Sequence, residues 1–228
     1  MFTPSVNAII ELSVMLTMVR MTPTRRGFAA TLVLLLLSAC SDAPKEVAKK
    51  EPEKPADPLT GRQAFQKMYP AARAGATDAE PLQIQSYNLT EVKSGDGKAG
   101  AWQVTFVSPS QSKSRVYSWS AVEADGGLHK GVFPGQEQGW SGPSGQNMPF
   151  DAAAIRVDSD EALKTALAQK EIAEFVKKNP SKPITFIMEK TRRFEDVYWR
   201  VLWGESVGTS EYTVFVDAST GKFLEKAR

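Results

Sequence analysis

The chain has 228 residues, of which 28 are basic and 26 acidic, and its formal net charge is +2. The first 40 residues contain three of the basic residues and one of the acidic ones, so the remainder has 25 of each. A charge-balanced protein lacks the basic surface that neutralises phosphates, which argues against nucleic acid as a partner. About 188 residues follow position 40, enough for one larger domain or two small ones.

Residues 27–39 form one short apolar run that follows an arginine pair and ends in small residues. This order is typical of a secretory signal peptide. At about 13 residues the run is too short to cross a membrane as a helix, which takes roughly 20. Residues 1–20 contain a poorer apolar stretch interrupted by Glu11, so translation could start at Met18 or Met21.

The apolar run ends in Leu37-Ser38-Ala39-Cys40. These four residues resemble the lipobox of bacterial lipoproteins, in which aliphatic and small residues precede the cysteine. The resemblance implies cleavage after Ala39 and acylation of Cys40, and two or more acyl chains would anchor the protein stably to a membrane. Cys40 is the only cysteine in the sequence, so an internal disulfide is excluded. In a Gram-negative cell, Ser41 in place of an aspartate favours the outer membrane over the inner one.

The arginine pair in Thr24-Arg25-Arg26-Gly27-Phe28 suits either the general secretory route or the twin-arginine route of export. Residues 41–58 are rich in Pro, Lys and Glu and have too few apolar side chains to form a core, which is typical of an extended linker. We therefore expect a signal peptide at 1–39 and a lipidated flexible tether at 40–58. The folded part would then face the periplasm from a lipid anchor in the cell envelope.

A first folded segment is expected at 59–133. Thr60 and Gln63 form a capping-box pattern at the start of a helix, which Pro70 should kink or end. Alternating apolar residues and turn signals then predict strands. These strands are expected at 82–92, 102–106 and 117–121.

A Gly/Pro-rich connector is expected at 134–157, followed by a second folded segment at 158–228. Asp158 and Glu161 open its helix, and the apolar residues then change face, which predicts a break at 168–171. Strands are expected after this helix at 184–190, 198–204 and 211–217, with a turn and a short closing strand at 220–224.

The two segments follow the same plan of a helix and then several strands. The strand at 102–106 begins with Trp-Gln-Val, and the strand at 199–203 begins with Trp-Arg-Val. Self-similarity of this kind indicates internal repetition. We therefore expect an α+β fold of two pseudo-repeats, each a helix packed on a small antiparallel β-sheet.

The second segment ends in a strand at 212–216 followed by Asp217-Ala218-Ser219-Thr220-Gly221. Together with Tyr198-Trp199-Arg200-Val201, this ending resembles the PepSY type of domain, known from propeptides of thermolysin-like metallopeptidases and from bacterial envelope proteins. In the first segment Val122-Glu123-Ala124-Asp125-Gly126 replaces the ending. The resemblance implies a helix on a small antiparallel sheet and a role in binding or inhibiting peptidases or in envelope signalling. It implies no catalytic residue.

The sequence lacks a set of residues that would carry catalysis or hold a metal. His129 is the only histidine, so a zinc site lacks further ligands, and a Cys–His pair would have to use the acylated Cys40. A hydrolase with a Ser–His–Asp triad built on His129 is the least favoured alternative. Ser108, Ser141 and Ser144 lie outside any G-x-S-x-G elbow. The acidic residues of the last strands, Glu205, Glu211 and Asp217, are interpreted as exposed partners of basic residues or, for Asp217, as part of a turn. We expect a non-enzymatic protein without metal or cofactor.

The apolar residues of the second segment predict two buried faces. Trp199, Val201 and Trp203 should pack under the second helix. Ile187, Leu202 and Phe215 alternate onto the opposite face, which either the first repeat or an outside partner should cover. Trp140 in the connector could join the same partner surface or lie across the interface between repeats.

We therefore expect a membrane-anchored protein that binds an envelope protein or peptide. The regulation of a peptidase is one form that this binding could take. The alternative is a small-ligand-binding or sensory lipoprotein of the envelope.

Overall fold

The computed structural model describes residues 56–228. The expected signal peptide, the cleavage site at Ala39, the acylated Cys40 and nearly all of the tether lie outside these residues and stay predictions. Within residues 56–228, no helix has the length and apolar character needed to cross a bilayer.

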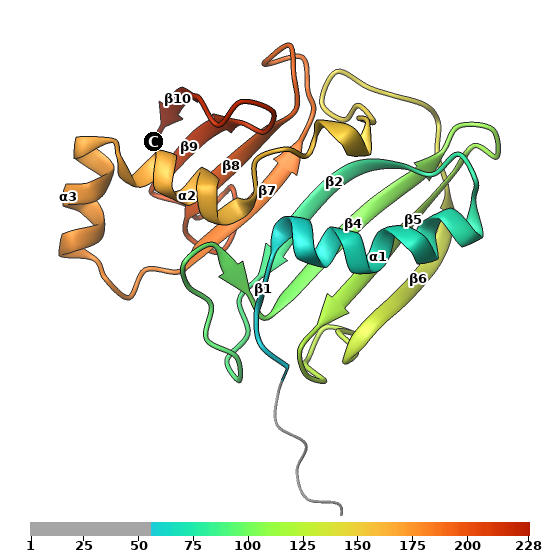
Figure 1. Ribbon diagram of the computed structural model, residues 1–228, viewed down its shortest axis with the longest axis horizontal. Helices are drawn as coiled ribbons and strands as arrows, with labels where there is room; N and C mark the ends of the chain where they lie inside the picture. Colours follow the sequence, from blue (N-terminus) through green and yellow to red (C-terminus); the bar gives the residue numbers. More distant parts are fainter. Residues whose placement is uncertain (1–55) are drawn as a thin grey trace, which may run out of the picture. The chain divides into compact units, whose positions relative to one another are not determined.

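The described residues form ten strands, three α-helices and one 3₁₀ helix, η1 (Figure 1). In sequence order the elements are β1 (Leu59–Thr60), α1 (Gly61–Gly75), β2 (Glu80–Tyr87), β3 (Lys98–Ala99), β4 (Ala101–Ser108), β5 (Lys113–Ser120), β6 (Gly131–Gly139), η1 (Ala152–Ala154), α2 (Ser159–Leu167), α3 (Lys170–Lys178), β7 (Ile184–Glu189), β8 (Tyr198–Trp203), β9 (Tyr212–Asp217) and β10 (Phe223–Ala227).

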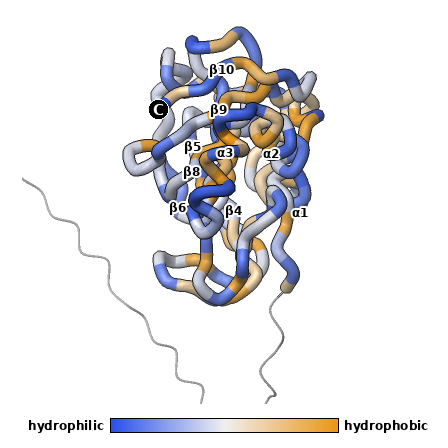
Figure 2. Tube along the Cα trace, turned by 90° about the vertical axis from the view of Figure 1, so that its left-hand side faces the viewer, coloured by the Kyte–Doolittle hydropathy of each residue, from blue (hydrophilic) through white to orange (hydrophobic). Residues whose placement is uncertain are grey.

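Eight of the strands form one antiparallel sheet in the order β10-β9-β8-β7-β2-β4-β5-β6, and β1 pairs with β3 beside it. Helices α1 and α2 lie on the same side of the large sheet, as Figures 1 and 2 show from two directions. We call the side that they cover the helix face and the other side the opposite face. The α+β class expected from the sequence is confirmed.

The sheet consists of two runs of strands that lie side by side. One run is β2-β4-β5-β6 and the other is β7-β8-β9-β10, and they join through antiparallel pairing of β2 with β7. In this register Gln83 lies opposite Glu189 and Gln85 lies opposite Ile187. The expectation that the first run covers the opposite face of the second is therefore wrong, because the two runs meet at their edges.

Helix α1 begins at the predicted capping box and runs to Gly75. The backbone N–H of Gln63 donates to the Thr60 hydroxyl, and the Gln63 side chain accepts from the Thr60 N–H, so the capping box is confirmed. The helix continues through Pro70 to Gly75, so of the two effects expected of Pro70 an end at Tyr69 does not occur. The exposed proline removes one backbone hydrogen bond, whereas Ala72 beyond it is buried against the sheet and favours continuation.

The second helical region divides as the change of apolar face predicts. Asp158 and Glu161 form the capping box of α2, which ends at Leu167, and α3 starts at Lys170 after a two-residue break. Ile172 on α3 is fully buried, so both helices contribute to the core despite the change of direction.

The core lies between the helices and the sheet and contains large aromatic side chains. Trp102 and Trp199 meet edge to face with ring centroids 6.3 Å apart, and each donates its indole N–H to a backbone carbonyl, of Leu59 and Val157 respectively. The predicted helix-face residues Trp199, Val201 and Trp203 are all buried in this core. The two runs of strands therefore share one continuous hydrophobic core.

The connector predicted at 134–157 starts later than expected. Gly131–Gly139 is an edge strand, β6, that pairs with β5, so the prediction is wrong for residues 134–139. An edge strand tolerates Pro134 and several glycines because its outer side needs no sheet partner. Similarly, β2 ends at Tyr87 and not at Val92.

Candidate functional site

The residues proposed from the sequence as a partner surface lie in two places. Ile187, Leu202 and Phe215 share the opposite face of β7, β8 and β9, as predicted, but their exposed fractions are 4%, 0% and 2%. Trp140 follows β6, and its backbone N–H donates to the Ser112 carbonyl in the β4–β5 turn. Strands β2, β4 and β5 separate these two places. The four side chains therefore form no common exposed apolar patch.

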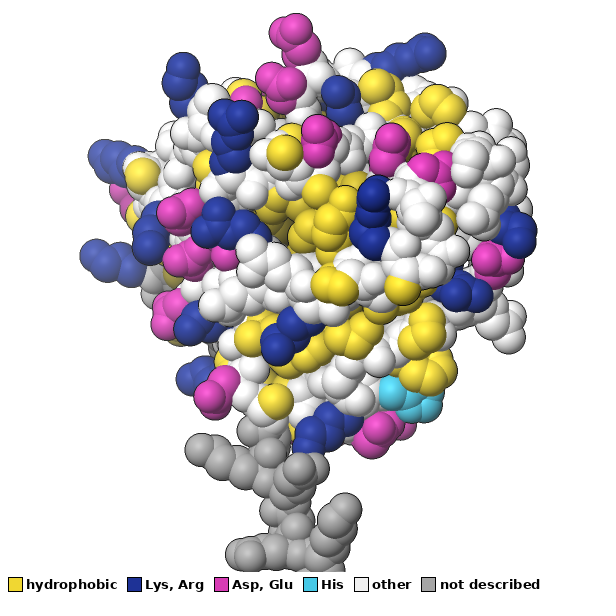
Figure 3. All heavy atoms as spheres, turned by 45° about the vertical axis from the view of Figure 1, so that its right-hand side comes forward, with side chains coloured by type: hydrophobic (Ala, Val, Ile, Leu, Met, Phe, Trp, Pro, Cys, Tyr) yellow, Lys and Arg dark blue, Asp and Glu magenta, His cyan; other side chains and the backbone are white. Residues whose placement is uncertain are grey.

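The residues examined for catalysis have simple surface partners. His129 lies 3.1 Å from the Glu123 carboxylate and its ring centre lies 4.3 Å from that of Phe133. The histidine and its acidic and apolar neighbours are visible at the lower right of Figure 3. The Lys130 N–H and the His129 ring lower the pKa of Glu123, because both stabilise its ionised form. Within residues 56–228 no group of three or more His, Cys, Asp or Glu side chains could hold a metal ion.

The serine and acidic candidates are also engaged elsewhere. The Ser108 hydroxyl donates to Asp78 at 2.6 Å. Glu211 pairs with Lys182 at the surface. Asp217 accepts the backbone N–H groups of Ser219 and Thr220, which confirms the turn predicted for it.

A polar cluster that the sequence reasoning missed lies on the opposite face of β7 and β8. Its centre is Glu189, whose residue is only 6% exposed. Glu189 Oε2 accepts from the Gln83 amide at 3.2 Å, and Oε1 accepts from the Tyr198 hydroxyl at 3.1 Å and from Arg200 Nη1 at 2.9 Å. A buried carboxylate is expensive unless it is paired and hydrogen-bonded, and Glu189 meets this condition.

The strand register brings this cluster together. Gln83 on β2, Glu189 on β7 and Tyr198 on β8 are direct cross-strand neighbours in one row. Arg200 lies two residues after Tyr198 on β8 and therefore points to the same face. Three strands from both runs of the sheet thus contribute to one hydrogen-bonded group.

Tyr198 links Glu189 to the loop between β7 and β8. Its hydroxyl lies 3.0 Å from the Thr191 hydroxyl and 3.1 Å from Glu189. Burial of the ring and the nearby carboxylate raise the pKa of Tyr198, so the phenol stays protonated at neutral pH and donates to Glu189.

Two arginines, Arg193 and Arg200, lie over Phe215 beside this cluster, and Arg192 lines the same hollow. We call these three residues the arginine cluster. The Arg193 guanidinium lies 4.5 Å from the centre of the Phe215 ring, and that of Arg200 lies 5.4 Å from it. Arg193 also donates to Glu225 at 2.8 Å. Both guanidinium groups are therefore held in place by an aromatic face and by a carboxylate.

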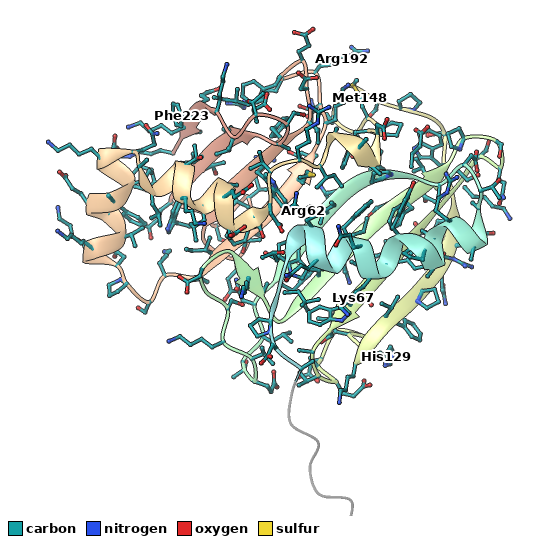
Figure 4. All side chains as sticks on the ribbon, viewed as in Figure 1. Arg62, Lys67, His129, Met148, Arg192 and Phe223 are labelled. Atoms are coloured by element: carbon teal, nitrogen blue, oxygen red, sulfur yellow. The ribbon has the colours of Figure 1, made fainter. Side chains whose placement is uncertain are left out.

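Residues 144–148 of the connector close one side of the arginine cluster. The Arg192 N–H donates to the Gly145 carbonyl at 2.8 Å, and the Met148 N–H donates to the Lys190 carbonyl at 3.0 Å. Figure 4 shows Arg192 and Met148 near one another above the end of β7. A Cβ on Gly145 would lie 3.0 Å from the Arg192 side chain, so a glycine suits this close approach.

These elements enclose a hollow of about 570 Å³, open solvent included. It is lined by Gly145, Gln146, Glu189, Thr191, Arg192, Arg193, Tyr198, Arg200 and Phe215. The lining has three positive charges and one negative charge, and most of its side chains are polar. Its Glu189 and Tyr198 groups already bond to one another, so the chemistry that remains available in the hollow is the binding of an anion by guanidinium groups.

A second buried carboxylate, Asp158, lies where α1 and α2 begin. It accepts hydrogen bonds from the Thr60 hydroxyl at 2.6 Å and from the backbone N–H groups of Ser159 at 2.7 Å and Arg62 at 2.9 Å. The Arg62 side chain lies between the first turns of the two helices in Figure 4 and donates to the Arg156 carbonyl. Asp158 therefore caps its own helix and also binds the first turn of α1.

Comparison of the sequence and fold with known protein families, with curated proteins and with solved structures found no match. We therefore take the hollow beside the arginine cluster as the candidate functional site on the basis of its geometry and charge.

Proposed function

We propose that this is a lipid-anchored protein of the bacterial cell envelope that binds a protein or peptide partner and catalyses no reaction. Acylated Cys40 would hold it on the periplasmic side of a membrane, with the outer membrane favoured in a Gram-negative cell. Its folded part would consist of two PepSY-like modules, at 59–133 and 158–228, and the partner could be a peptidase that it regulates.

The order of the elements supports two modules of one kind. Helix α1 precedes β2, β4, β5 and β6, and helices α2 and α3 precede β7, β8, β9 and β10. In the sheet each run proceeds outward from the central pair β2 and β7. Two helix-and-sheet modules joined through their first strands would produce this order, and their helices would both lie on one face.

The observation that carries the binding proposal is the hollow lined by the arginine cluster. It lies on the face of the sheet that α1 and α2 do not cover, and it contains fixed guanidinium groups beside an exposed arginine, Arg192. Charged residues that are oriented by the fold, but whose donors are only partly used, are suited to recognising a partner. The sequence has one histidine and one cysteine, so we propose no reaction that would need a pair of such residues.

The anchoring part of the proposal is tested with a Cys40→Ser variant. Cells grown with a labelled fatty acid should label the native protein and not the variant, and the variant should be released from the membrane fraction. A variant that stays labelled and membrane-bound would refute lipid anchoring through Cys40.

The binding part is tested by placing a photo-crosslinking amino acid at Gln146, at the rim of the hollow, in living cells. The matched control carries the same group at Lys67 on the exposed side of α1. We expect one discrete crosslinked envelope partner from position 146 and none from position 67. Equal crosslinking from both positions, or none from either, would count against a partner site at the hollow.

A small-ligand or sensory lipoprotein is the second candidate function. The part of the hollow that water-sized groups can occupy is about 270 Å³, close to the lower end of the range of about 300–1,000 Å³ that is common for small-molecule sites. A rise in unfolding temperature with metabolites, and no such rise with peptides, would favour this function over the first.

A further inference from the structure

We infer that the hollow binds a single carboxylate group of a peptide, either its C-terminal carboxylate or an acidic side group, through Arg192 and Arg200. This inference names the ligand class of the proposed partner site and so rests on the proposed function. Three observations carry it: the unused donors, the balance of charges and the shape of the groups that line the hollow.

The unused donors belong to Arg192 and Arg200. A guanidinium has five N–H donors. Arg200 uses only Nη1, toward Glu189, for hydrogen bonds within residues 56–228, and the Arg192 side chain forms no hydrogen bond or ion pair with the described part of the protein. Arg200 Nε is buried without a partner among the described residues. The hollow therefore offers far more donors than its own carboxylate accepts.

The balance of charges favours a ligand with one negative charge. Glu189 compensates Arg200, and Glu225 compensates Arg193, at 2.9 Å and 2.8 Å respectively. Of the three arginines, only Arg192 has no counter-charge among the described residues, so these ion pairs leave about one unit of positive charge at the hollow. A phosphate monoester carries about two negative charges at neutral pH, and the second would meet the nearby carboxylates.

The acidic groups around the hollow limit the positive charge that a ligand meets there. Glu189 and Glu225 contact arginines of the cluster, and Asp217 lies on the same face of β9, opposite Tyr198. The Asp217 carboxylate is stabilised by two backbone N–H groups of its own turn. These three carboxylates make the hollow a poor site for a polyanion. Asp217 does not line the hollow and forms no ion pair with an arginine among the described residues, so Arg192 stays available to a single carboxylate.

The shape of the groups favours a carboxylate. Guanidinium forks match the planar, two-oxygen geometry of a carboxylate and can bind it through two parallel hydrogen bonds. Arg200 is oriented by Glu189 and Phe215, so little side-chain freedom is lost when a ligand binds. Gly145 and Gln146 also line the hollow and offer backbone and amide groups to the peptide part of the ligand.

The experiment uses the intact protein purified in detergent and the peptide acetyl-tetra-alanine with a free C-terminal carboxylate. The signals of the arginine Nε–H groups in ¹⁵N NMR spectra report binding at individual guanidiniums. We expect saturable shifts for Arg192 and Arg200, and no shift with the same peptide carrying a C-terminal amide. Inorganic phosphate is the second probe, and it should bind more weakly than the carboxylate peptide.

The deciding variant is Arg192→Gln, since Arg192 is exposed and lies outside the buried network. We expect its affinity for the carboxylate peptide to fall by about tenfold, the loss typical of one charged hydrogen-bonding group. Lys67→Gln, with the same charge change on α1, should leave the affinity unchanged. Arg192→Lys keeps the charge without the fork and should fall between the two.

Failure of this inference can be told from failure of the proposed function. If the peptide carboxylate and amide bind equally, or neither binds, or phosphate binds more tightly than the carboxylate, the ligand class is wrong. A discrete crosslink at position 146 would then still support a partner at the hollow. If carboxylate binds but no partner crosslinks, the protein-partner function is wrong while the carboxylate site remains.

Discussion

Two carboxylates are buried within residues 56–228, Asp158 and Glu189, and both have an exposed fraction of 6%, but their surroundings are very different. Asp158 is enclosed by the first turns of α1 and α2, and its hydrogen-bond donors are backbone N–H groups and the Thr60 hydroxyl, with the Arg62 guanidinium 3.7 Å away. Glu189 is held by Gln83, Tyr198 and Arg200, and these lie beside a hollow.

The two sites differ in how many of the N–H and O–H donors around the carboxylate remain unused. Around Asp158 the hydroxyl and backbone donors are consumed, and Ser159 completes the group by accepting from the Gly61 N–H and donating to the Gly97 carbonyl. The Arg62 guanidinium adds an ion pair at 3.7 Å from the solvent side, where no hollow adjoins it among those described. Around Glu189 the guanidinium groups retain most of their N–H donors. Burial of a charge by itself therefore does not indicate function, because a closed network stabilises the fold whereas a network with spare donors beside a cavity can also bind a ligand.

The largest expected effect comes from removing the Asp158 carboxylate. Asp158→Ala should lower the free energy of unfolding by about 3 kcal/mol, because it removes a helix cap and leaves buried donors unsatisfied. Chemical denaturation measures this loss. The neighbouring Asp160→Ala, which removes a surface i,i+4 pair with Lys164, should change stability by less than about 0.5 kcal/mol. Equal effects of the two changes would contradict the role assigned to Asp158.

A second prediction concerns the place where the loop with Gly97 packs against the start of α2. Gly97 has φ +77°, and a Cβ there would lie 2.2 Å from the Asp160 Cα at the start of α2. Gly126 has a similar φ of +79°, but nothing lies within 4 Å of its Cβ position. Gly126→Ala should cost about 1 kcal/mol from backbone conformation alone, whereas Gly97→Ala should cost about 2–4 kcal/mol because the loop and helix must also separate. The comparison is read from denaturation midpoints of the two variants.

The smallest effect concerns a carboxylate that has strong donors without burial. The Ser108 hydroxyl and the Ser110 N–H lower the pKa of Asp78 from its ordinary 3.8 to about 2. Because the folded-state pKa is the lower one, the stabilisation by Asp78 is present at neutral pH and is lost as the pH falls from 3.8 through about 2. Titration of its carboxyl carbon by NMR should give a midpoint near 2, and Ser108→Ala should move this midpoint upward. A midpoint of Asp78 near 3.8 in the native protein would contradict this account.

The sequence predicted those parts of the fold that depend on neighbouring residues. The capping boxes at Thr60 and Asp158 and the turn at Asp217, with Gly221 at φ +73°, each depend on contacts within four residues. The alternation of Ile187, Leu202 and Phe215 also predicted their common face. The cover of Phe215 could not be predicted, because it comes from Phe194 and Arg193 of the loop between β7 and β8 and from Arg200 of β8.

The parts that were missed depend on contacts between distant residues. Edge strand β6 forms because β5 offers a partner, although its own glycines and Pro134 favour a loop. The group around Glu189 requires Gln83, which is 106 residues away, and the hollow also requires Gly145 from the connector. One signal was available in the sequence: Glu189 is followed closely by Arg192 and Arg193, and Tyr198 and Arg200 alternate onto one strand face.

The measurement that tests the comparison of the two carboxylates most directly is made on Glu189→Gln. The amide keeps an acceptor for Tyr198 and Arg200, and Gln83 can rotate its own amide to pair with the new donor, so the geometry of the site should persist. We expect the free energy of unfolding to fall by about 2 kcal/mol as the ion pair is lost, while the affinity for the carboxylate peptide rises by about threefold or more because a nearby negative charge is gone. A variant in which stability and carboxylate affinity fall together would contradict the assignment of the arginine cluster as the binding site.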